Sequence, residues 1–149
     1  MIYSATLNGD SSQKFHELCD NQANTLVIIK TENNNIFGGF ASKTWNSMEL
    51  GRKKDLKSFL FSIVNKKIYN PKHDDVNNKR YHLFCSKKDG PCFYAFSIEN
   101  LCLENGGICD EIIKCNYDSF ENDYEINNGN REFKIKELEM YKIIFYENI

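Results

Sequence analysis

The stretch TLVIIKTENNNIFGGFAS, residues 25–42, decides the expected fold. Residues 25–31 are rich in β-branched side chains, which favour a strand. The run ENNN then supplies a turn, because asparagine tolerates left-handed backbone and caps its own turns. Residues 36–42, IFGGFAS, have the composition of the partner strand. The stretch therefore predicts a β-hairpin.

Gly38 and Gly39 lie inside the second strand of this hairpin, where they could cradle a ligand or admit a close backbone approach. A phosphate-binding loop needs further glycines or a lysine at fixed spacing, with a helix directly after it. Phe40, Ala41 and Ser42 follow instead, with no helix signal. Glycine inside a strand typically marks a bulge or a close approach, so we predict a structural role.

The segment before the hairpin predicts one strand and one short helix. Residues 2–7, IYSATL, alternate weakly and are expected to form the strand. Asp10 followed by Gln13 is a capping-box pattern, and the apolar residues after it share one helical face, which predicts a helix over 11–19. His16 lies off that face, so we expect it to be solvated rather than catalytic.

The segment DLKSFLFSIVN, residues 55–65, is ambiguous. Its apolar positions match a helical face, yet FLFSIV is also an apolar run suited to a strand that is covered on both sides. Periodicity leaves both alternatives open.

The second half of the chain carries mostly strand patterns. Strands are expected over 80–86, 92–98 and 131–146, a strand or bulged edge over 98–107, a turn at 89–91 and a solvated polar loop over 116–130. Alternation in the last strand predicts that Ile135 and Leu138 face opposite ways. Six or more strands with few helices predict a mainly β fold, a two-sheet antiparallel β-sandwich flanked by short helices.

Composition limits the class of protein. The 149 residues are 41% hydrophobic, enough for a single domain over 1–149 with its own core. The 19 basic and 21 acidic side chains give a net charge of -2, which does not support nucleic-acid binding. The N-terminus MIYSATLNGD has no secretory pattern, and no apolar run approaches the roughly 20 residues that span a bilayer. We expect a cytoplasmic protein.

The sequence contains no residue pattern that indicates catalysis or metal binding. No pair among the six cysteines (Cys19, Cys85, Cys92, Cys102, Cys109 and Cys115) has Cys-x-x-Cys spacing, and the histidines lack metal-ligand spacing. In a reducing cytoplasm we expect buried free thiols; a redox-responsive thiol with a lowered pKa is the alternative. His82, among aromatic neighbours, is expected to be packed. We expect no catalytic residues, no metal and no cofactor.

Several stretches together resemble the TLDc domain of eukaryotic oxidation-resistance and nuclear-receptor-coactivator proteins. They are IYSATLNGDSSQKFHELCD, TLVIIKTENNNIFGGFASKTWNS, SFLFSI and REFKIKELEMYKI, and the resemblance runs over nearly the whole chain. The family-motif positions are held by Tyr3, Ser4, Phe15, Cys19, Asp20, Phe37, Gly38, Gly39, Phe40 and Trp45. The resemblance implies a two-sheet sandwich, makes FLFSIV a core strand and gives these positions structural roles.

The resemblance also implies a function. TLDc proteins have no established catalytic residues; members protect cells from oxidative damage, and several bind and regulate the vacuolar proton-pumping ATPase. This chain would then be a non-catalytic protein-binding module, with that ATPase as partner and with membrane association only through the partner. An adaptor that recruits other proteins is the alternative.

Exposed charged groups are the first-choice partner contacts. They are Arg52, Lys53, Lys54 and Lys57, expected on loops, and Glu137 and Glu139 in the closing segment. A second basic group contains Lys66, Lys67 and Lys72. Such groups suit an acidic protein face or a phospholipid surface, whereas loop solubility is the plainer interpretation.

Overall fold

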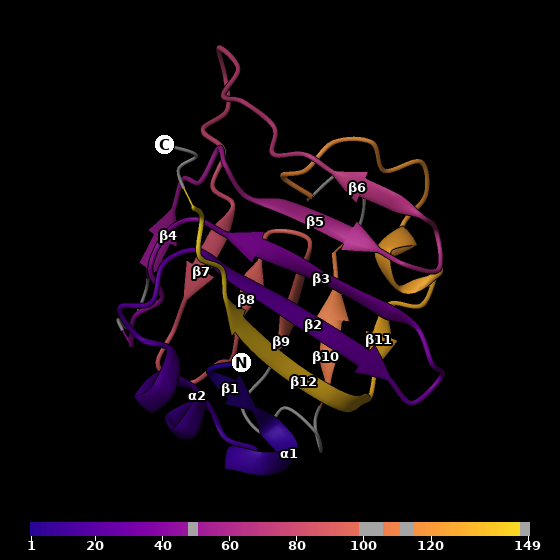
Figure 1. The fold of residues 1–149 in the computed structure, drawn as a ribbon. Helices are drawn as coiled ribbons and strands as arrows, with labels where there is room; N and C mark the ends of the chain where they lie inside the picture. Colours follow the sequence, from indigo (N-terminus) through magenta and orange to yellow (C-terminus); the bar gives the residue numbers. More distant parts are fainter. Residues whose placement is uncertain (48–50, 99–105, 111–114, 147–149) are drawn as a thin grey trace.

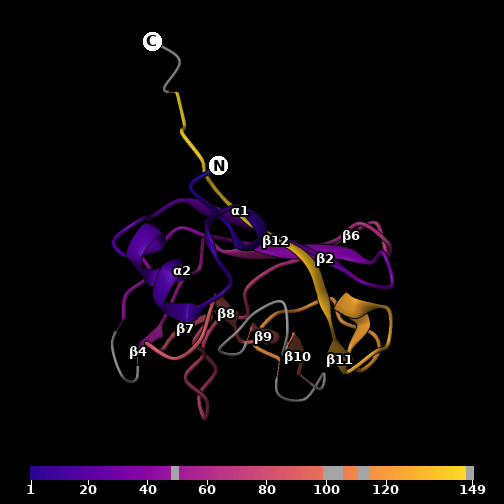
Figure 2. The same cartoon turned by 90° about the horizontal axis from the view of Figure 1, so that it is seen from below.

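The computed structural model describes residues 1–47, 51–98, 106–110 and 115–146. These residues form two antiparallel sheets of six strands that lie face to face, with two short α-helices at one end (Figure 1, Figure 2). The expected mainly β sandwich with short helices is confirmed. None of the described helices is long and apolar enough to cross a membrane.

The first sheet pairs strands from the beginning and the end of the described chain. Its order is β1-β12-β2-β3-β5-β6. The strands are β1 (Tyr3–Ser4), β12 (Ile135–Lys142), β2 (Thr25–Thr31), β3 (Ile36–Ala41), β5 (Phe59–Ser62) and β6 (Lys67–Tyr69). Figure 1 shows the outer face of this sheet, and the helices lie beside β1 rather than over β2 and β3.

The second sheet lies behind the first in Figure 1, with the order β11-β10-β9-β8-β7-β4. Its strands are β11 (Glu132–Phe133), β10 (Gly107–Cys109), β9 (Phe96–Ile98), β8 (Cys92–Phe93), β7 (Leu83–Cys85) and β4 (Gly51–Lys53). The helices are α1 (Ala5–Asn8), α2 (Ser12–Cys19) and the 3-10 helix η1 (Glu125–Asn127).

The core lies between the inner faces of the two sheets. Burial alternates along β2, where Val27 and Ile29 are fully buried and their neighbours are half-buried on the outer face. Phe37 of β3 meets Phe96 and Phe133 of the second sheet edge to face, with ring centroids 5.4 and 5.1 Å apart. Aromatic packing of this kind joins the two layers.

The expected hairpin over 25–42 is confirmed as β2 and β3, and its two glycines lie where side chains do not fit. A Cβ atom at Gly38 would lie 1.9 Å from the carbonyl oxygen of Val27, and one at Gly39 would lie 2.7 Å from the ring of Phe93. Backbone and side chains therefore fill the space that a ligand cradle would need.

The N-terminal segment differs from the strand predicted over 2–7. Only Tyr3 and Ser4 pair with β12, and α1 begins at the next residue. The side chain of Asn8 accepts the backbone N–H of Ser4 at 2.8 Å. This local hydrogen bond competes with strand pairing and stabilises a helical turn.

The helix predicted over 11–19 is confirmed as α2, but its N-cap is Ser11 and not Asp10. The Ser11 hydroxyl accepts the backbone N–H of Lys14 at 3.1 Å. Phe15 and Cys19 of this helix are fully buried, as the helical periodicity predicts.

The aromatic segment over 92–98 is a hairpin and not the single strand predicted. Phe93 of β8 pairs with Phe96 of β9, so Tyr94 and Ala95 form the turn. Ala95 donates its N–H to the carbonyl of Phe93 at 2.7 Å, which is a three-residue turn. No asparagine or glycine marks it, so the usual hairpin signal is missing.

Two further predicted strands differ in extent. The strand predicted over 80–86 is limited to β7. Of the strand or bulged edge predicted over 98–107, residues 99–105 lie outside the described residues.

The closing segment 131–146 changes sheets instead of forming one strand. β11 ends at Phe133 in the second sheet, and β12 begins at Ile135 in the first. A register shift between Ile135 and Glu137 adds Lys136 as an extra residue, which is a β-bulge. Because of this bulge, Ile135 and Leu138 are both buried in the core, and the prediction that they face opposite ways is wrong.

The ambiguous segment over 55–65 contains the strand β5. Leu60 is buried, whereas Phe59 and Phe61 are half-buried on the outer face. Ile63 and Val64 follow the strand and are 58% and 45% exposed. The strand is therefore confirmed, but the expectation that FLFSIV is covered on both sides is wrong.

Candidate protein-interaction surface

Aromatic family-motif residues gather at one end of the sandwich. Tyr3 meets Phe15 edge to face at 5.7 Å, Phe15 meets Trp45 at 6.0 Å, and Trp45 meets Phe93 at 5.7 Å. Cys19 is fully buried in the same cluster. The structure thus brings Tyr3, Cys19 and Trp45 together, while Phe37, Gly38, Gly39 and Phe40 all lie on β3.

Asp20 and Trp45 tie α2 to the segment after β3. The indole Nε1 of Trp45 donates to the hydroxyl of Thr25 at 2.8 Å. Asp20 and Trp45 form an isolated parallel bridge, and the Asp20 carboxylate accepts the hydroxyl of Ser47 and contacts the Nδ1 atom of His16. These polar contacts position the helix on the sandwich.

His16 is buried, and the prediction that it is solvated is wrong. Its Nδ1 atom lies 2.7 Å from the Asp20 carboxylate. Its Nε2 atom lies 2.8 Å from the carbonyl oxygen of Ser86 and 3.0 Å from that of Asp89. Both ring nitrogens face oxygen acceptors of the fold, so His16 connects α2 to the loop between β7 and β8.

His82 is fully buried, in agreement with the expectation that it is packed. Its Nδ1 accepts the backbone N–H of Asp55 at 3.0 Å, and its Nε2 donates to the carbonyl of Lys72 at 2.9 Å. Burial lowers the pKa of His82 from its ordinary value. The neutral ring therefore has a structural role, and both its nitrogens are engaged.

Asp55 carries a buried carboxylate that organises two loops. One oxygen accepts the N–H of Ser42 at 2.7 Å and that of Lys43 at 3.2 Å. The other accepts the hydroxyl of Ser42 and the N–H of Lys57 at 3.2 Å. Asp55 is 1% exposed, so these bonds satisfy a charge that burial would otherwise destabilise.

Above Asp55 lies a cavity of about 460 Å³, lined by Asn24, Ser42, Lys43, Lys54, Asp55, Leu56 and Lys57. We call Lys43, Lys54 and Lys57 the lysine cradle. Lys54 forms an ion pair with Asp74. The ammonium groups of Lys43 and Lys57 have no ion-pair partner among the described residues. The cradle therefore keeps a net positive charge, because the Asp55 carboxylate in the same lining offsets only one of these two lysines.

The predicted basic contacts are arranged differently from the expected loop. Arg52 and Lys53 belong to β4 and pair with β7, so the prediction of a loop is wrong for them. The ammonium group of Lys53 donates a hydrogen bond to the carbonyl of Thr44, and this bond holds the Lys53 side chain against the fold. Lys54 and Lys57 line the cavity together with Lys43, which lies outside the basic run and which no sequence pattern indicates.

The outer face of the first sheet is apolar next to the cradle. Cross-strand pairing aligns Tyr141, Leu26, Phe40 and Phe59 in one row across four strands. A second row on the same face consists of Ile28, Gly38, Phe61 and Ile68. Phe40 stacks on Phe59 at 5.3 Å and meets Phe145 edge to face at 6.2 Å. We call these two rows the apolar rows.

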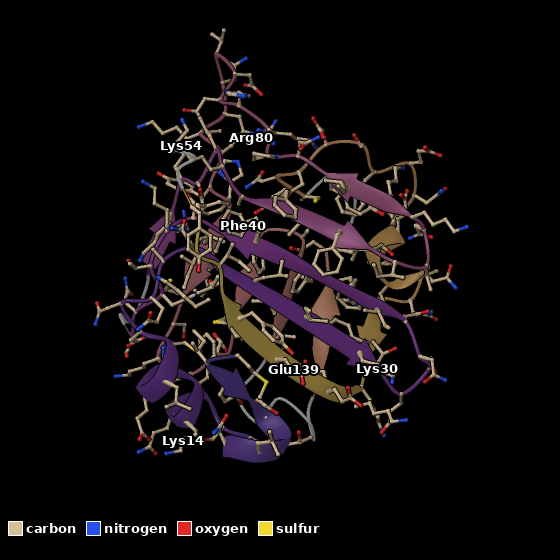
Figure 3. All side chains as sticks on the ribbon, viewed as in Figure 1. Lys14, Lys30, Phe40, Lys54, Arg80 and Glu139 are labelled. Atoms are coloured by element: carbon tan, nitrogen blue, oxygen red, sulfur yellow. The ribbon has the colours of Figure 1, made fainter. Side chains whose placement is uncertain are left out.

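Glu137 and Glu139, the predicted acidic contacts, lie on β12 opposite Lys30 and Ile28. Glu139 accepts the hydroxyl of Tyr141 at 2.8 Å, and Glu137 lies 3.9 Å from the ammonium group of Lys30. In Figure 3, Lys54 and Phe40 lie toward one end of this face, and Glu139 and Lys30 lie toward the other. The structure therefore separates the acidic contacts from the lysine cradle.

Comparison with known proteins identifies the family. The sequence model of the TLDc domain family matches residues 1–144. This chain belongs to the TLDc domain family. A stretch of 63 residues is 30% identical to MTOR-associated protein MEAK7 of Danio rerio, and it covers 42% of this chain but 14% of that protein's length.

The cysteines of this TLDc domain that the structure describes are buried thiols, namely Cys19, Cys85, Cys92, Cys109 and Cys115. Burial, and then the neighbouring Asp20 carboxylate, raise the pKa of Cys19 to about 12. Burial likewise raises the pKa of Cys115 to about 12 and the pKa of both Cys85 and Cys109. Raised pKa values suppress the reactive thiolate. Cys102 lies outside the described residues.

Two lysines of the second basic group of the TLDc domain are held by residues in and directly before the loop over 116–130. Lys67 pairs with Glu125 at 2.8 Å, and Lys72 donates to the carbonyl of Cys115 at 3.0 Å. The Glu125 side chain is only 11% exposed, so the prediction of a solvated loop is wrong there. Burial alone would raise the pKa of Glu125, but its hydrogen bonds outweigh this effect and lower the pKa.

Another cavity, of about 550 Å³, lies where the chain crosses between the sheets. It is lined by Thr31, Glu32, Asn33, Gly107, Ile108, Glu132, Phe133 and Lys134. It contains no histidine or cysteine, and no group of three or more metal-binding side chains occurs among the described residues. The lysine cradle with the apolar rows is therefore the better candidate for recognition.

Proposed function

We propose that this TLDc domain, acting as one unit over 1–149, is a non-catalytic protein-interaction module. The observation that carries the proposal is the contrast between its interior and its surface. His16, His82 and Asp55 have their polar atoms engaged within the fold. Lys43 and Lys57 lie exposed beside the apolar rows, a combination that suits protein recognition.

The proposed partner is the vacuolar proton-pumping ATPase, which the TLDc resemblance implies, and the proposed location is the cytoplasm. The name of MEAK7 states that this protein associates with MTOR, which supports protein binding as the shared property. Protection against oxidative damage would then follow from regulation of the partner. The raised pKa values of the buried thiols make a redox-responsive thiol the weaker alternative.

The test uses the purified domain and the vacuolar ATPase of the same organism. The domain is added at increasing concentration, and co-sedimentation and ATP hydrolysis are recorded together. We expect saturable binding accompanied by changed hydrolysis or subunit release. If the domain does not co-sediment at high micromolar concentration, the ATPase is not its partner. An unbiased affinity capture would then identify the assembly that an adaptor role requires.

A further inference from the structure

The lysine cradle adjoins the apolar rows at the ends of three strands. Asn24 directly precedes β2, Ser42 directly follows β3, and Lys57 lies two residues before Phe59, the first residue of β5. These three residues line one cavity. Positive charge therefore lies directly next to the apolar surface.

We propose that this face binds an amphipathic segment of a partner protein, with apolar side chains on the apolar rows and acidic residues in the lysine cradle. The proposal deepens the protein-binding function above and rests on it. Leu26, Ile28 and Phe61 are half-buried, Ile68 is 59% exposed, and no described helix covers β2 or β3 (Figure 1). An occupant would bury this surface.

Charge specifies the end of the segment that enters the cradle. The Asp55 carboxylate fixes the backbone of both Lys43 and Lys57, so their side chains project from anchored positions. Neither ammonium group has an ion-pair partner among the described residues. Because the backbone at both lysines is fixed before binding, less backbone freedom is lost when a partner binds. Carboxylates of the occupant complement them.

The opposite end of the same face favours a protein over an anionic membrane. Glu139 of β12 is level with the second apolar row, opposite Ile28, and Glu137 lies one step further from the cradle, opposite Lys30. A uniformly anionic lipid surface would be repelled by these carboxylates, whereas a protein segment can change charge along its length. From Thr25 to Thr31, β2 rises about 20 Å. A helix of about 14 residues spans that length.

The probes are two synthetic helical peptides of about 14 residues with the same leucine face. One carries two glutamates at one end, and the other carries two lysines at those positions. Each is titrated into ¹⁵N-labelled domain, and the shifted backbone amides are mapped. We expect the glutamate peptide to shift the amides of β2, β3, β5, Lys43 and Lys57 and to bind about tenfold more tightly than the lysine peptide.

Two matched protein variants complete the test. The variant Lys43→Glu/Lys57→Glu reverses the charge of two cradle lysines. The variant Lys88→Glu/Lys136→Glu makes the same charge change at exposed lysines away from the cavity. The first variant is expected to prefer the lysine peptide, whereas the control keeps the wild-type preference. Unchanged native-like spectra establish that both variants are folded.

Several results would overturn this proposal. They are equal binding of the two peptides, no binding, shifts that map elsewhere, and displacement of the glutamate peptide by phosphatidylserine vesicles. Shifts of β2 and β3 amides on dilution of the domain alone would identify a second copy as the occupant instead. If these results appear while the domain still co-sediments with the ATPase, the surface is wrong and the proposed function stands.

Discussion

Phe40 and Phe59 stack on the outer face of the first sheet with ring centroids 5.3 Å apart and an interplanar angle of 18°. The two rings come from neighbouring strands, and each lies two residues from a group that lines the cradle, Ser42 or Lys57. The fold therefore joins an aromatic surface to the positive end of the same face. Such a junction suits a partner that is apolar and acidic in adjacent positions.

Asp55→Ala should destabilise the domain by about 3 kcal/mol, because it leaves the part-buried N–H groups of Ser42 and Lys43 without their acceptor. Urea unfolding measures the change. Glu132→Ala, at an exposed carboxylate, is the control and should stay within about 0.5 kcal/mol of wild type. Equal free energies of unfolding for the two variants would show that Asp55 does not organise the cradle.

Gly39→Ala should cost about 2 kcal/mol, because its Cβ would press against the Phe93 ring in the core. Gly38→Ala should cost more, since its Cβ would meet the backbone oxygen of Val27, which cannot rotate away. Thermal and urea unfolding would give both values. A stability equal to wild type in either variant would contradict the close approach.

Stability should fall as the pH drops below about 6.5, the ordinary pKa of histidine in the unfolded chain. Burial lowers the pKa of His82 in the fold, so the unfolded chain takes up its proton first and acid favours unfolding. The stability that the neutral His82 ring contributes is complete above about pH 6.5. It is lost as the pH falls from there through the pKa of His82 in the folded domain.

The pH effect is measured by comparing the wild type with His82→Gln at about pH 7.5 and at about pH 5.5. The stability advantage of the wild type should shrink at the lower pH. An advantage that is constant or larger in acid would show that His82 is not neutral in the fold.

The buried thiols should react slowly in the native state. Cys102→Ser isolates the five described cysteines, and an aromatic disulfide reagent near neutral pH then reports their accessibility. We expect almost no reaction in minutes, and full reaction once the chain is unfolded in urea. A rapid reaction of even one native thiol would restore the redox-responsive alternative.

Much of the fold follows from local patterns in the chain. The β-branched run over 25–31, the asparagine turn and the apolar partner strand predict the hairpin, since each signal acts over a few residues. The helix around Phe15 follows from periodicity in the same way. What the local pattern could not give was the turn at Tyr94 and Ala95, which lacks the usual turn residues.

The remaining errors concern contacts between distant parts of the chain. His16 is buried because the carbonyl of Ser86 reaches it from 70 residues away. Lys43 joins Lys57 because a buried carboxylate between them binds the backbone of both. Sequence separation conceals such contacts, so the basic run alone pointed to Arg52 and Lys53, whereas the fold places Lys43 in the cavity.

The most direct measurement is the affinity of the domain for the vacuolar ATPase in three forms, by co-sedimentation at equilibrium. The forms are wild type, Lys43→Glu/Lys57→Glu and Lys88→Glu/Lys136→Glu. We expect the cradle variant to bind about tenfold more weakly, since two charge contacts are reversed, while the control binds like wild type. Equal affinities for all three forms would contradict a partner surface built on the lysine cradle, and no binding by any form would contradict the ATPase as partner.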